Sequence, residues 1–151
     1  MQMKKDYPRI KLSHDSYATD EWIMSMFEDW FDPCPLNPSF DPTKDVDGLK
    51  IDWGEKTYVN PPYSNPLPWV KKAVQEAATG SRVALLLKHD TSTAWYRILH
   101  EANAHVLLVG ERLRYCTKRT AAFPSALFIL DPTIPPHQYN ITEVKTNGED
   151  E

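Results

Sequence analysis

An unbroken apolar run at residues 82–87 constrains the fold of this chain more than any other segment. It reads Arg-Val-Ala-Leu-Leu-Leu, a pattern typical of a strand that is covered on both faces. Helical and strand-like spacings alternate around it. The expected helices cover 67–79 and a segment that carries Trp95, Ile98, Leu99 and Ala102. The expected strands cover 56–59, 82–87, 105–109 and 126–130, the last two also buried. This alternation predicts an α/β sandwich with a mainly parallel central sheet flanked by helices.

The ends of the expected helices carry their usual signals. Thr19 is a suitable N-cap for a first helix whose apolar stripe runs to Trp30, before Asp32-Pro33 stops it. Gly80 stands where the C-terminal cap of the helix at 67–79 belongs. Thr91 or Ser92 is suited to cap the helix that carries Trp95 and Ala102.

Polar residues follow the predicted strands directly. Asp32, Asn60 and the pair His89-Asp90 all fall at strand ends. In parallel α/β sheets the ligand binds beyond the carboxyl ends of the strands. These side chains are therefore expected to share one edge of the sheet.

The length and composition indicate one soluble domain. Of the 151 residues, 1–144 are expected to form this domain and the polar tail at 145–151 to be disordered. No apolar run approaches the ~20 residues that span a bilayer, and no signal-like segment follows the N-terminus, so a cytoplasmic protein is expected. The cysteines and histidines lack metal-ligand spacing, so no metal is expected.

The charge distribution bears on nucleic-acid binding. The net charge of −4 counts mildly against a large nucleic-acid footprint, because phosphate contacts need Lys and Arg. One basic patch surrounds Tyr115 and consists of Arg112, Arg114, Lys118 and Arg119. Taken alone, this patch fits a solvated loop as well as a nucleic-acid contact.

The sequence Asn60-Pro61-Pro62-Tyr63 follows the predicted strand at 56–59. The lone pair of a planar amino group is delocalised, which makes it a poor nucleophile. Two acceptors on its hydrogens, the side-chain oxygen of Asn60 and the backbone carbonyl of Pro61, favour a pyramidal nitrogen and free that lone pair. The two prolines keep the turn stiff, and Tyr63 can stack on the flat face of a base.

This motif resembles that of the S-adenosylmethionine-dependent amino-methyltransferases, which read Asp/Asn/Ser-Pro-Pro-Tyr/Phe/Trp. More closely, the chain resembles the small phage-type DNA N6-adenine methyltransferases. Three further segments carry the resemblance: 17–22 (Tyr-Ala-Thr-Asp-Glu-Trp), 31–34 (Phe-Asp-Pro-Cys) and 47–53 (Asp-Gly-Leu-x-x-x-Trp). The resemblance covers roughly residues 16–130, with the cofactor motif before the catalytic motif.

The resemblance implies a compact, reduced Rossmann-like fold and S-adenosyl-L-methionine as cofactor. The implied reaction is direct in-line displacement from the sulfonium to the N6 of an adenine that is flipped out of double-stranded DNA. The implied catalytic residues are Asn60, Pro61, Pro62 and Tyr63. The implied cofactor-binding residues are Thr19, Asp32, Pro33, Cys34, Asp47, Gly48 and Leu49.

The chain departs from the family pattern in two respects. Asp20 replaces the usual proline of the first segment, and Pro35 and Asn37 stand where larger methyltransferases have glycines. The acid that binds the cofactor ribose is left open between Asp41 and Asp45. Because no separate recognition domain is present, substrate contacts are expected from 111–124. They comprise the basic patch, with Tyr115 or Phe123 as a second wall of the base pocket.

Other functions share parts of this pattern. Cytosine-C5 chemistry uses a Pro-Cys nucleophile, but Cys34 fits the cofactor motif, and Asn60-Pro61-Pro62-Tyr63 has no place in that reaction. The catalytic motif also serves enzymes that methylate an RNA base or a protein glutamine. A non-catalytic relative that keeps the fold is the third alternative.

Overall fold

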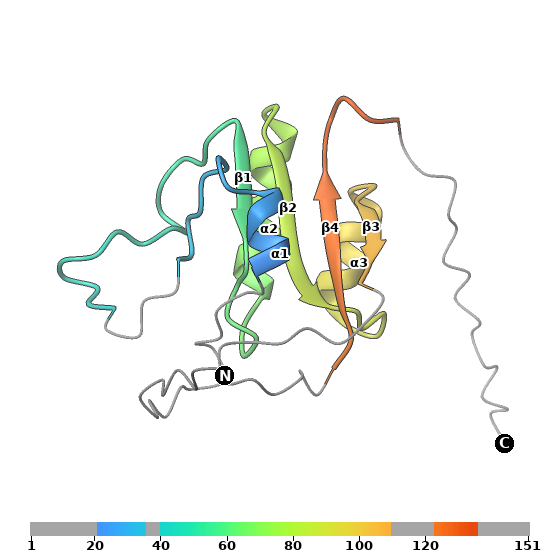
Figure 1. The fold of residues 1–151 in the computed structure, drawn as a ribbon, viewed down its shortest axis with the longest axis horizontal. Coiled ribbons are helices and arrows are strands. Elements are labelled where there is room, and N and C mark those ends of the chain that lie inside the picture. The colour runs from blue at the N-terminus through green and yellow to red at the C-terminus, as the bar shows by residue number, and fades with distance from the viewer. Residues whose placement is uncertain (1–20, 36–39, 110–122, 136–151) are drawn as a thin grey trace, which may run out of the picture.

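The computed structural model describes residues 21–35, 40–109 and 123–135. Within these ranges the chain forms a mixed α/β structure (Figure 1), which confirms the predicted α/β class. Its elements, in chain order, are α1 (Glu21–Met26), β1 (Lys56–Val59), α2 (Leu67–Ala78), β2 (Arg82–Lys88), α3 (Ala94–Glu101), β3 (His105–Leu108) and β4 (Ser125–Leu130). No helix in these ranges is long and apolar enough to cross a bilayer.

The four strands form one sheet in the order β1-β2-β4-β3. β1 pairs with β2 in parallel, with Val59 opposite Leu85. β4 runs antiparallel to both of its neighbours, β2 and β3. The prediction of a mainly parallel sheet is therefore wrong.

The direction of β4 explains this error. The crossover through α3 makes β2 and β3 run in the same direction, as the alternation of strands and helices predicts. β4 then enters between them from the opposite direction. A continuous apolar run indicates burial on both faces, but its spacing is the same for either strand direction. The sequence pattern therefore holds no information on the orientation of β4.

Helices cover both faces of the sheet (Figure 1). Helices α2 and α3 pack on one face, against Val83, Leu85 and Leu87 of β2. Helix α1 packs on the other face, where Ile23 and Phe27 contact the cluster that includes Tyr58, Ala84, Leu86 and Leu127. β2 is buried on both faces, as its unbroken apolar run predicts.

β3 is less buried than predicted. Because β4 separates it from β2, β3 lies at the edge of the sheet. Leu107 is 50% exposed and Leu108 is 70% exposed, so the expectation of a buried strand at 105–109 is wrong. A buried strand and an apolar edge strand have the same sequence pattern, because only the neighbouring elements distinguish them.

The helix ends agree only in part with their predicted signals. Gly80 follows α2 with a φ of 108°, a conformation that favours glycine at this position. The N-cap of α3 is Thr93, whose hydroxyl accepts a hydrogen bond from the Tyr96 amide. The predicted caps Thr91 and Ser92 are therefore wrong, because the Ser92 amide and hydroxyl both donate to the Asp90 carboxylate.

The first helix is shorter than its apolar stripe. α1 ends at Met26, yet Phe27 beyond its end is still buried. Trp30 packs edge-on against the Phe27 ring, with centroids 5.0 Å apart. The apolar stripe predicts a helix up to Trp30, but its last part lies in a turn. There the side chains of Phe27 and Trp30 still pack together. The predicted cap Thr19 and the tail at 145–151 lie outside the described residues.

Candidate active site

Asp32 lies at the same edge of the sheet as Asn60. Phe31 forms an isolated parallel bridge with Thr57 of β1. The Phe31 amide donates to the Lys56 carbonyl at 2.9 Å, and the Tyr58 amide donates to the Phe31 carbonyl at 2.8 Å. Asp32 therefore follows a short segment parallel to β1, as Asn60 follows β1 itself, and both residues lie beyond carboxyl ends.

The turn from Asn60 to Tyr63 connects β1 to α2. Pro61 is buried, and the side-chain oxygen Oδ1 of Asn60 is shielded from solvent. The Asn65 amide donates to the Pro62 carbonyl at 3.2 Å and closes the turn. Because two prolines fix their own φ angles, the backbone holds Asn60 and the Pro61 carbonyl in one arrangement.

Tyr63 lies in an aromatic pair with Phe123. Their ring centroids are 5.0 Å apart and their planes meet at 69°, an edge-to-face geometry that aromatic rings favour. Both rings pack against the core cluster on the α1 face of the sheet. Phe123 comes just before β4, and its partner Tyr63 comes just after β1, so the antiparallel direction of β4 brings these distant segments together.

Asp32 supplies a partly buried carboxylate. Its Oδ1 accepts a hydrogen bond from the Cys34 amide at 2.9 Å, and within the described ranges this is the bond that anchors the side chain. Burial raises the pKa of Asp32, and the hydrogen bond from the Cys34 amide offsets part of that rise. Burial, with the charge of Asp32 adding to it, also raises the pKa of the Cys34 thiol to about 12. Cys34 is therefore a neutral thiol at physiological pH.

The turn at Gly48 packs directly against Pro33. A Cβ added to Gly48 would lie 1.9 Å from the Pro33 carbonyl oxygen, so no side chain fits there. Asp47 Oδ1 accepts from the Leu49 amide at 3.0 Å, which shapes the turn. The structure thus joins two segments that are each predicted, from the family resemblance, to bind the cofactor.

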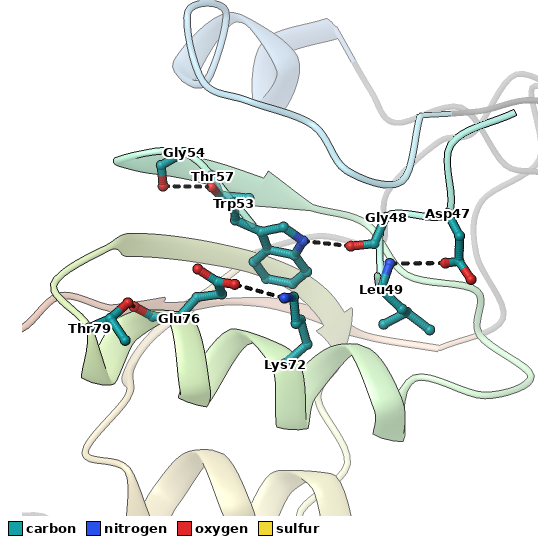
Figure 2. Close-up of polar contacts among 9 residues, drawn as sticks. All are labelled: Asp47, Gly48, Leu49, Trp53, Gly54, Thr57, Lys72, Glu76 and Thr79. Atoms are coloured by element: carbon teal, nitrogen blue, oxygen red, sulfur yellow. Dashed lines mark hydrogen bonds and ion pairs between the residues drawn. The ribbon is translucent and has the colours of Figure 1, made fainter. Parts of the chain in front are cut away.

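Trp53 connects this turn to helix α2. Its indole Nε1 donates to the Gly48 carbonyl at 2.8 Å, and Figure 2 shows the ring between the turn and α2. Lys72 of α2 places its ammonium 5.9 Å from the Trp53 ring centroid and forms an ion pair with Glu76 at 2.8 Å. Trp53 therefore fixes Gly48 relative to the helix that follows the predicted catalytic turn.

His89 and Asp90 follow β2, as predicted, but their side chains have local partners. His89 Nε2 lies 3.4 Å from the Tyr96 hydroxyl of α3. The Ser92 hydroxyl and amide, together with the charge of Lys88, lower the pKa of Asp90. Asp90 thus shapes the turn into α3.

Six predicted site residues lie outside the described residues: Thr19, Arg112, Arg114, Tyr115, Lys118 and Arg119. Within the described part of the chain, no group of three or more His, Cys, Asp or Glu side chains is arranged to hold a metal ion. The candidate acids for the ribose, Asp41 and Asp45, belong to one loop, in which the Asp41 amide donates to Asp45 Oδ2 at 2.8 Å.

Lys88 is a residue of this edge that the sequence analysis missed. Its ammonium lies 4.5 Å from the Phe123 ring centroid and 5.9 Å from that of Tyr63. The sequence does contain a signal for it. Lys88 is a charged residue at the end of a largely apolar strand, one position before His89-Asp90, which was predicted to lie at this edge.

Comparison with known proteins identifies the family. The sequence model of the DNA N-6-adenine-methyltransferase (Dam) family matches residues 11–128. A DNA N-6-adenine-methyltransferase of Haemophilus phage HP1 is 28% identical over 144 residues, which cover 83% of this chain and 83% of that protein. Another, of Escherichia phage T1, is 33% identical over 69 residues, which cover 44% of this chain and 29% of that protein. No solved structure gives a significant match. The family predicted from the motifs is confirmed, and the chain belongs to the DNA N-6-adenine-methyltransferase (Dam) family.

Proposed function

We propose that the edge shared by Asp32 and Asn60 is the active site at which this adenine-specific DNA methyltransferase transfers a methyl group from S-adenosyl-L-methionine to N6 of adenine. The observation that carries this proposal is the parallel bridge between Phe31 and Thr57. It aligns the predicted cofactor motif beside the predicted catalytic motif, at carboxyl strand ends, where α/β sheets bind ligands. In this proposal the Rossmann-like part of the fold is the parallel part of the sheet, which consists of the Phe31 segment, β1 and β2.

The residues on the Asp32 side fit the cofactor. Asp32 holds its loop with one carboxylate oxygen and can accept from an ammonium or ribose hydroxyl with the other. The Gly48 turn allows a close backbone approach to Pro33 that a side chain would block. When bound, S-adenosyl-L-methionine supplies the sulfonium methyl group for in-line displacement. Asp47 and Leu49 belong to the same turn and contribute its shape.

The residues on the Asn60 side fit the amino group. In this proposal the side-chain oxygen of Asn60 and the carbonyl of Pro61 accept the two N6 hydrogens, which frees the nitrogen lone pair. The rigid turn supplies the positioning on which rate enhancement of this kind depends. Tyr63 stacks on the adenine face. The extra proton that N6 carries after transfer leaves along one of these hydrogen bonds to solvent.

The substrate is double-stranded DNA whose target adenine is extruded, because N6 is not accessible to such a pocket inside the stack. The family match favours adenine in DNA over the RNA and protein acceptors that the catalytic motif alone leaves open. The proposed location is the cytoplasm of the prokaryotic cell that contains this DNA, since both phage relatives are DNA methyltransferases by name.

Methyl transfer tests the proposal. Labelled S-adenosyl-L-methionine is incubated with unmodified duplex DNA, and the label is located in N6-methyladenine after digestion. Asn60→Ala is expected to lower kcat by about 10²-fold or more, as loss of one aligned polar group at a reacting centre does. Asn60→Asp keeps an acceptor and is expected to retain more activity. Equal activity of wild type and Asn60→Ala would refute this site, while wild-type label in another base would refute the acceptor.

A further inference from the structure

Lys88 lies at the proposed active-site edge with its charge directed at two aromatic rings. It is the last residue of β2, and it is half-buried. Its ammonium is held over Phe123 at 4.5 Å and near Tyr63 at 5.9 Å from the ring centroids. These distances are within the range at which the ring quadrupole attracts a cation.

The ammonium of Lys88 has no ion-pair partner within the described ranges. Asp90, the next acid along the chain, accepts hydrogen bonds from the amide and hydroxyl of Ser92 at its Oδ1 atom. Charges that are withdrawn from water are normally paired, and Lys88 is partly withdrawn. The hydrogen bonds from Ser92 and, in addition, the charge of Lys88 lower the pKa of Asp90. Within the described ranges, however, the ammonium forms no ion pair and its close contacts are ring faces, so it is available to an anionic ligand.

The two aromatic rings beside this ammonium leave no gap for a base between them. Tyr63 and Phe123 meet edge to face with centroids 5.0 Å apart. A base that stacks between two rings needs them parallel and about 7 Å apart, twice the usual contact distance between carbon atoms. Adenine that enters between Tyr63 and Phe123 therefore has to displace Phe123, the ammonium, or both. The long flexible stem of a lysine allows its charge to move by several ångströms while the strand stays fixed.

An extruded nucleotide brings its own negative charge to this place. Rotating a nucleotide out of the duplex carries its phosphate toward the mouth of the base pocket. The whole chain has a net charge of −4, so a local cation matters more here than in a basic protein. Lysine binds phosphate as a compact point charge.

We propose that Lys88 is a DNA-binding residue, whose ammonium moves from the Tyr63–Phe123 pair to a phosphate of the extruded target nucleotide. This inference rests on the proposed stacking of adenine on Tyr63. In the free protein, Lys88 covers the rings that receive the base. In the complex, the same charge holds the backbone of the nucleotide, so base entry and phosphate binding are coupled through one side chain.

The salt dependence of DNA binding tests this assignment. Dissociation constants of the full chain for a short unmodified duplex are measured from about 50 to about 200 mM salt. Each phosphate contact contributes about 0.9 to the slope of log K against log salt. Lys88→Gln is expected to reduce this slope by about 0.9, so the fourfold rise in salt weakens its binding by about 3.5-fold less than wild type. Lys88→Arg is expected to retain the wild-type slope.

Lys56→Gln is the matched control. It removes the same charge from the same sheet, but at the amino end of β1, away from the proposed site. It is expected to leave the slope unchanged. A steady-state assay adds a second readout, in which Lys88→Gln raises KM for DNA about tenfold while kcat changes by less than about threefold, since a phosphate contact is uniform binding.

Two results would overturn the proposal. One is a salt slope of Lys88→Gln equal to that of wild type, which would show that Lys88 contacts the base or only packs against the rings. The other is an equal loss of slope in Lys56→Gln, which would show a general effect of net charge. Circular dichroism and thermal unfolding of each variant separate these results from misfolding. Failure of wild type to methylate or bind the duplex would instead count against the proposed function itself.

Discussion

Gly48 lies against the carbonyl of Pro33 so closely that a Cβ at position 48 would be 1.9 Å from the oxygen. The Asp47 turn and the Asp32 loop are therefore one structural unit, although they are apart in the sequence. Trp53 holds this unit against α2 through its hydrogen bond to the Gly48 carbonyl (Figure 2). The shape of the proposed cofactor site therefore depends on glycine, which has no Cβ, at position 48.

Gly48→Ala is the most direct test of this unit. Its methyl group has to push back the backbone of Pro33, and overpacking of this kind costs about 1–3 kcal/mol of unfolding free energy. We also expect the Kd for S-adenosyl-L-methionine to rise about tenfold or more, measured by calorimetry. Gly54→Ala is the control, because its Cβ would meet Phe31 Cβ at an ordinary 3.4 Å. Equal effects of the two substitutions on cofactor binding would contradict the close approach.

Asp32→Asn is expected to move stability and cofactor binding in opposite directions. Burial raises the pKa of Asp32, so the ionised carboxylate opposes folding. This cost is absent below the usual pKa of 3.8 and grows as pH rises through the higher value of the folded state. The variant should therefore have a higher Tm than wild type at neutral pH, and the difference should shrink as pH falls toward the usual pKa.

The same variant should lose affinity for S-adenosyl-L-methionine. Hydrogen bonds to a charged group contribute about 1.5–3 kcal/mol, which corresponds to about 10- to 150-fold in Kd. The asparagine side chain retains an oxygen for the Cys34 amide, so the loop keeps its anchor. Unchanged calorimetric affinity in a folded variant would remove Asp32 from the cofactor site.

Cys34 is expected to react slowly with alkylating reagents. Its pKa is about 12 rather than the usual 9.0, because it is buried and lies beside the charge of Asp32. In a Cys116→Ser background at about pH 8, iodoacetamide should modify the folded protein about 10²- to 10³-fold more slowly than the protein in guanidinium chloride. Since the unfolded thiol ionises first, this residue should also reduce stability between about pH 9 and 12. Comparable rates for folded and unfolded protein would contradict this environment.

Ser125→Ala is expected to be neutral or stabilising by up to about 1 kcal/mol. Ser125 is 2% exposed, and its hydroxyl has no hydrogen-bond partner among the described residues, so alanine removes a desolvated polar group. Thr57→Val is the contrast, because the buried Thr57 hydroxyl donates to the Gly54 carbonyl at 3.2 Å and its loss should cost about 1 kcal/mol. Chemical denaturation measures both, and a clear loss of stability in Ser125→Ala would show that its hydroxyl is satisfied.

Features that depend on local sequence alone were predicted correctly. The β1 strand, α2 and its Gly80, and the two-sided burial of β2 follow from apolar spacing and from residues with restricted backbone angles. The direction of β4 and the exposure of Leu108 did not follow, because they depend on which strand lies beside which. Thr93 as cap was missed because Asp90 competes for Ser92, which only the folded turn shows.

The proposed site shows the same division. Their positions at predicted strand ends pointed to Asn60 and Asp32 as neighbours, and the bridge at Phe31 places the segments before them side by side. The contact between Gly48 and Pro33 and the placement of Lys88 over Phe123 depend on tertiary packing, for which a single sequence contains no spacing rule. The roles of these residues in binding and catalysis stay predictions until the variants are measured.

The β3–β4 pair has a consequence for how target preference can diverge. The Val109 amide donates to the Ser125 carbonyl at 3.3 Å, so the ladder holds the two ends of the connection between these strands together, beside the proposed site. Lengthening a connection whose ends are fixed in this way is inexpensive, about 0.6 kcal/mol per doubling. Insertions and exchanges at 110–122 can therefore accumulate between relatives while Asp32 and Asn60 stay in place. Because substrate contacts are predicted at 111–124, we expect such changes to alter the sequence that is methylated while the proposed catalytic edge is kept.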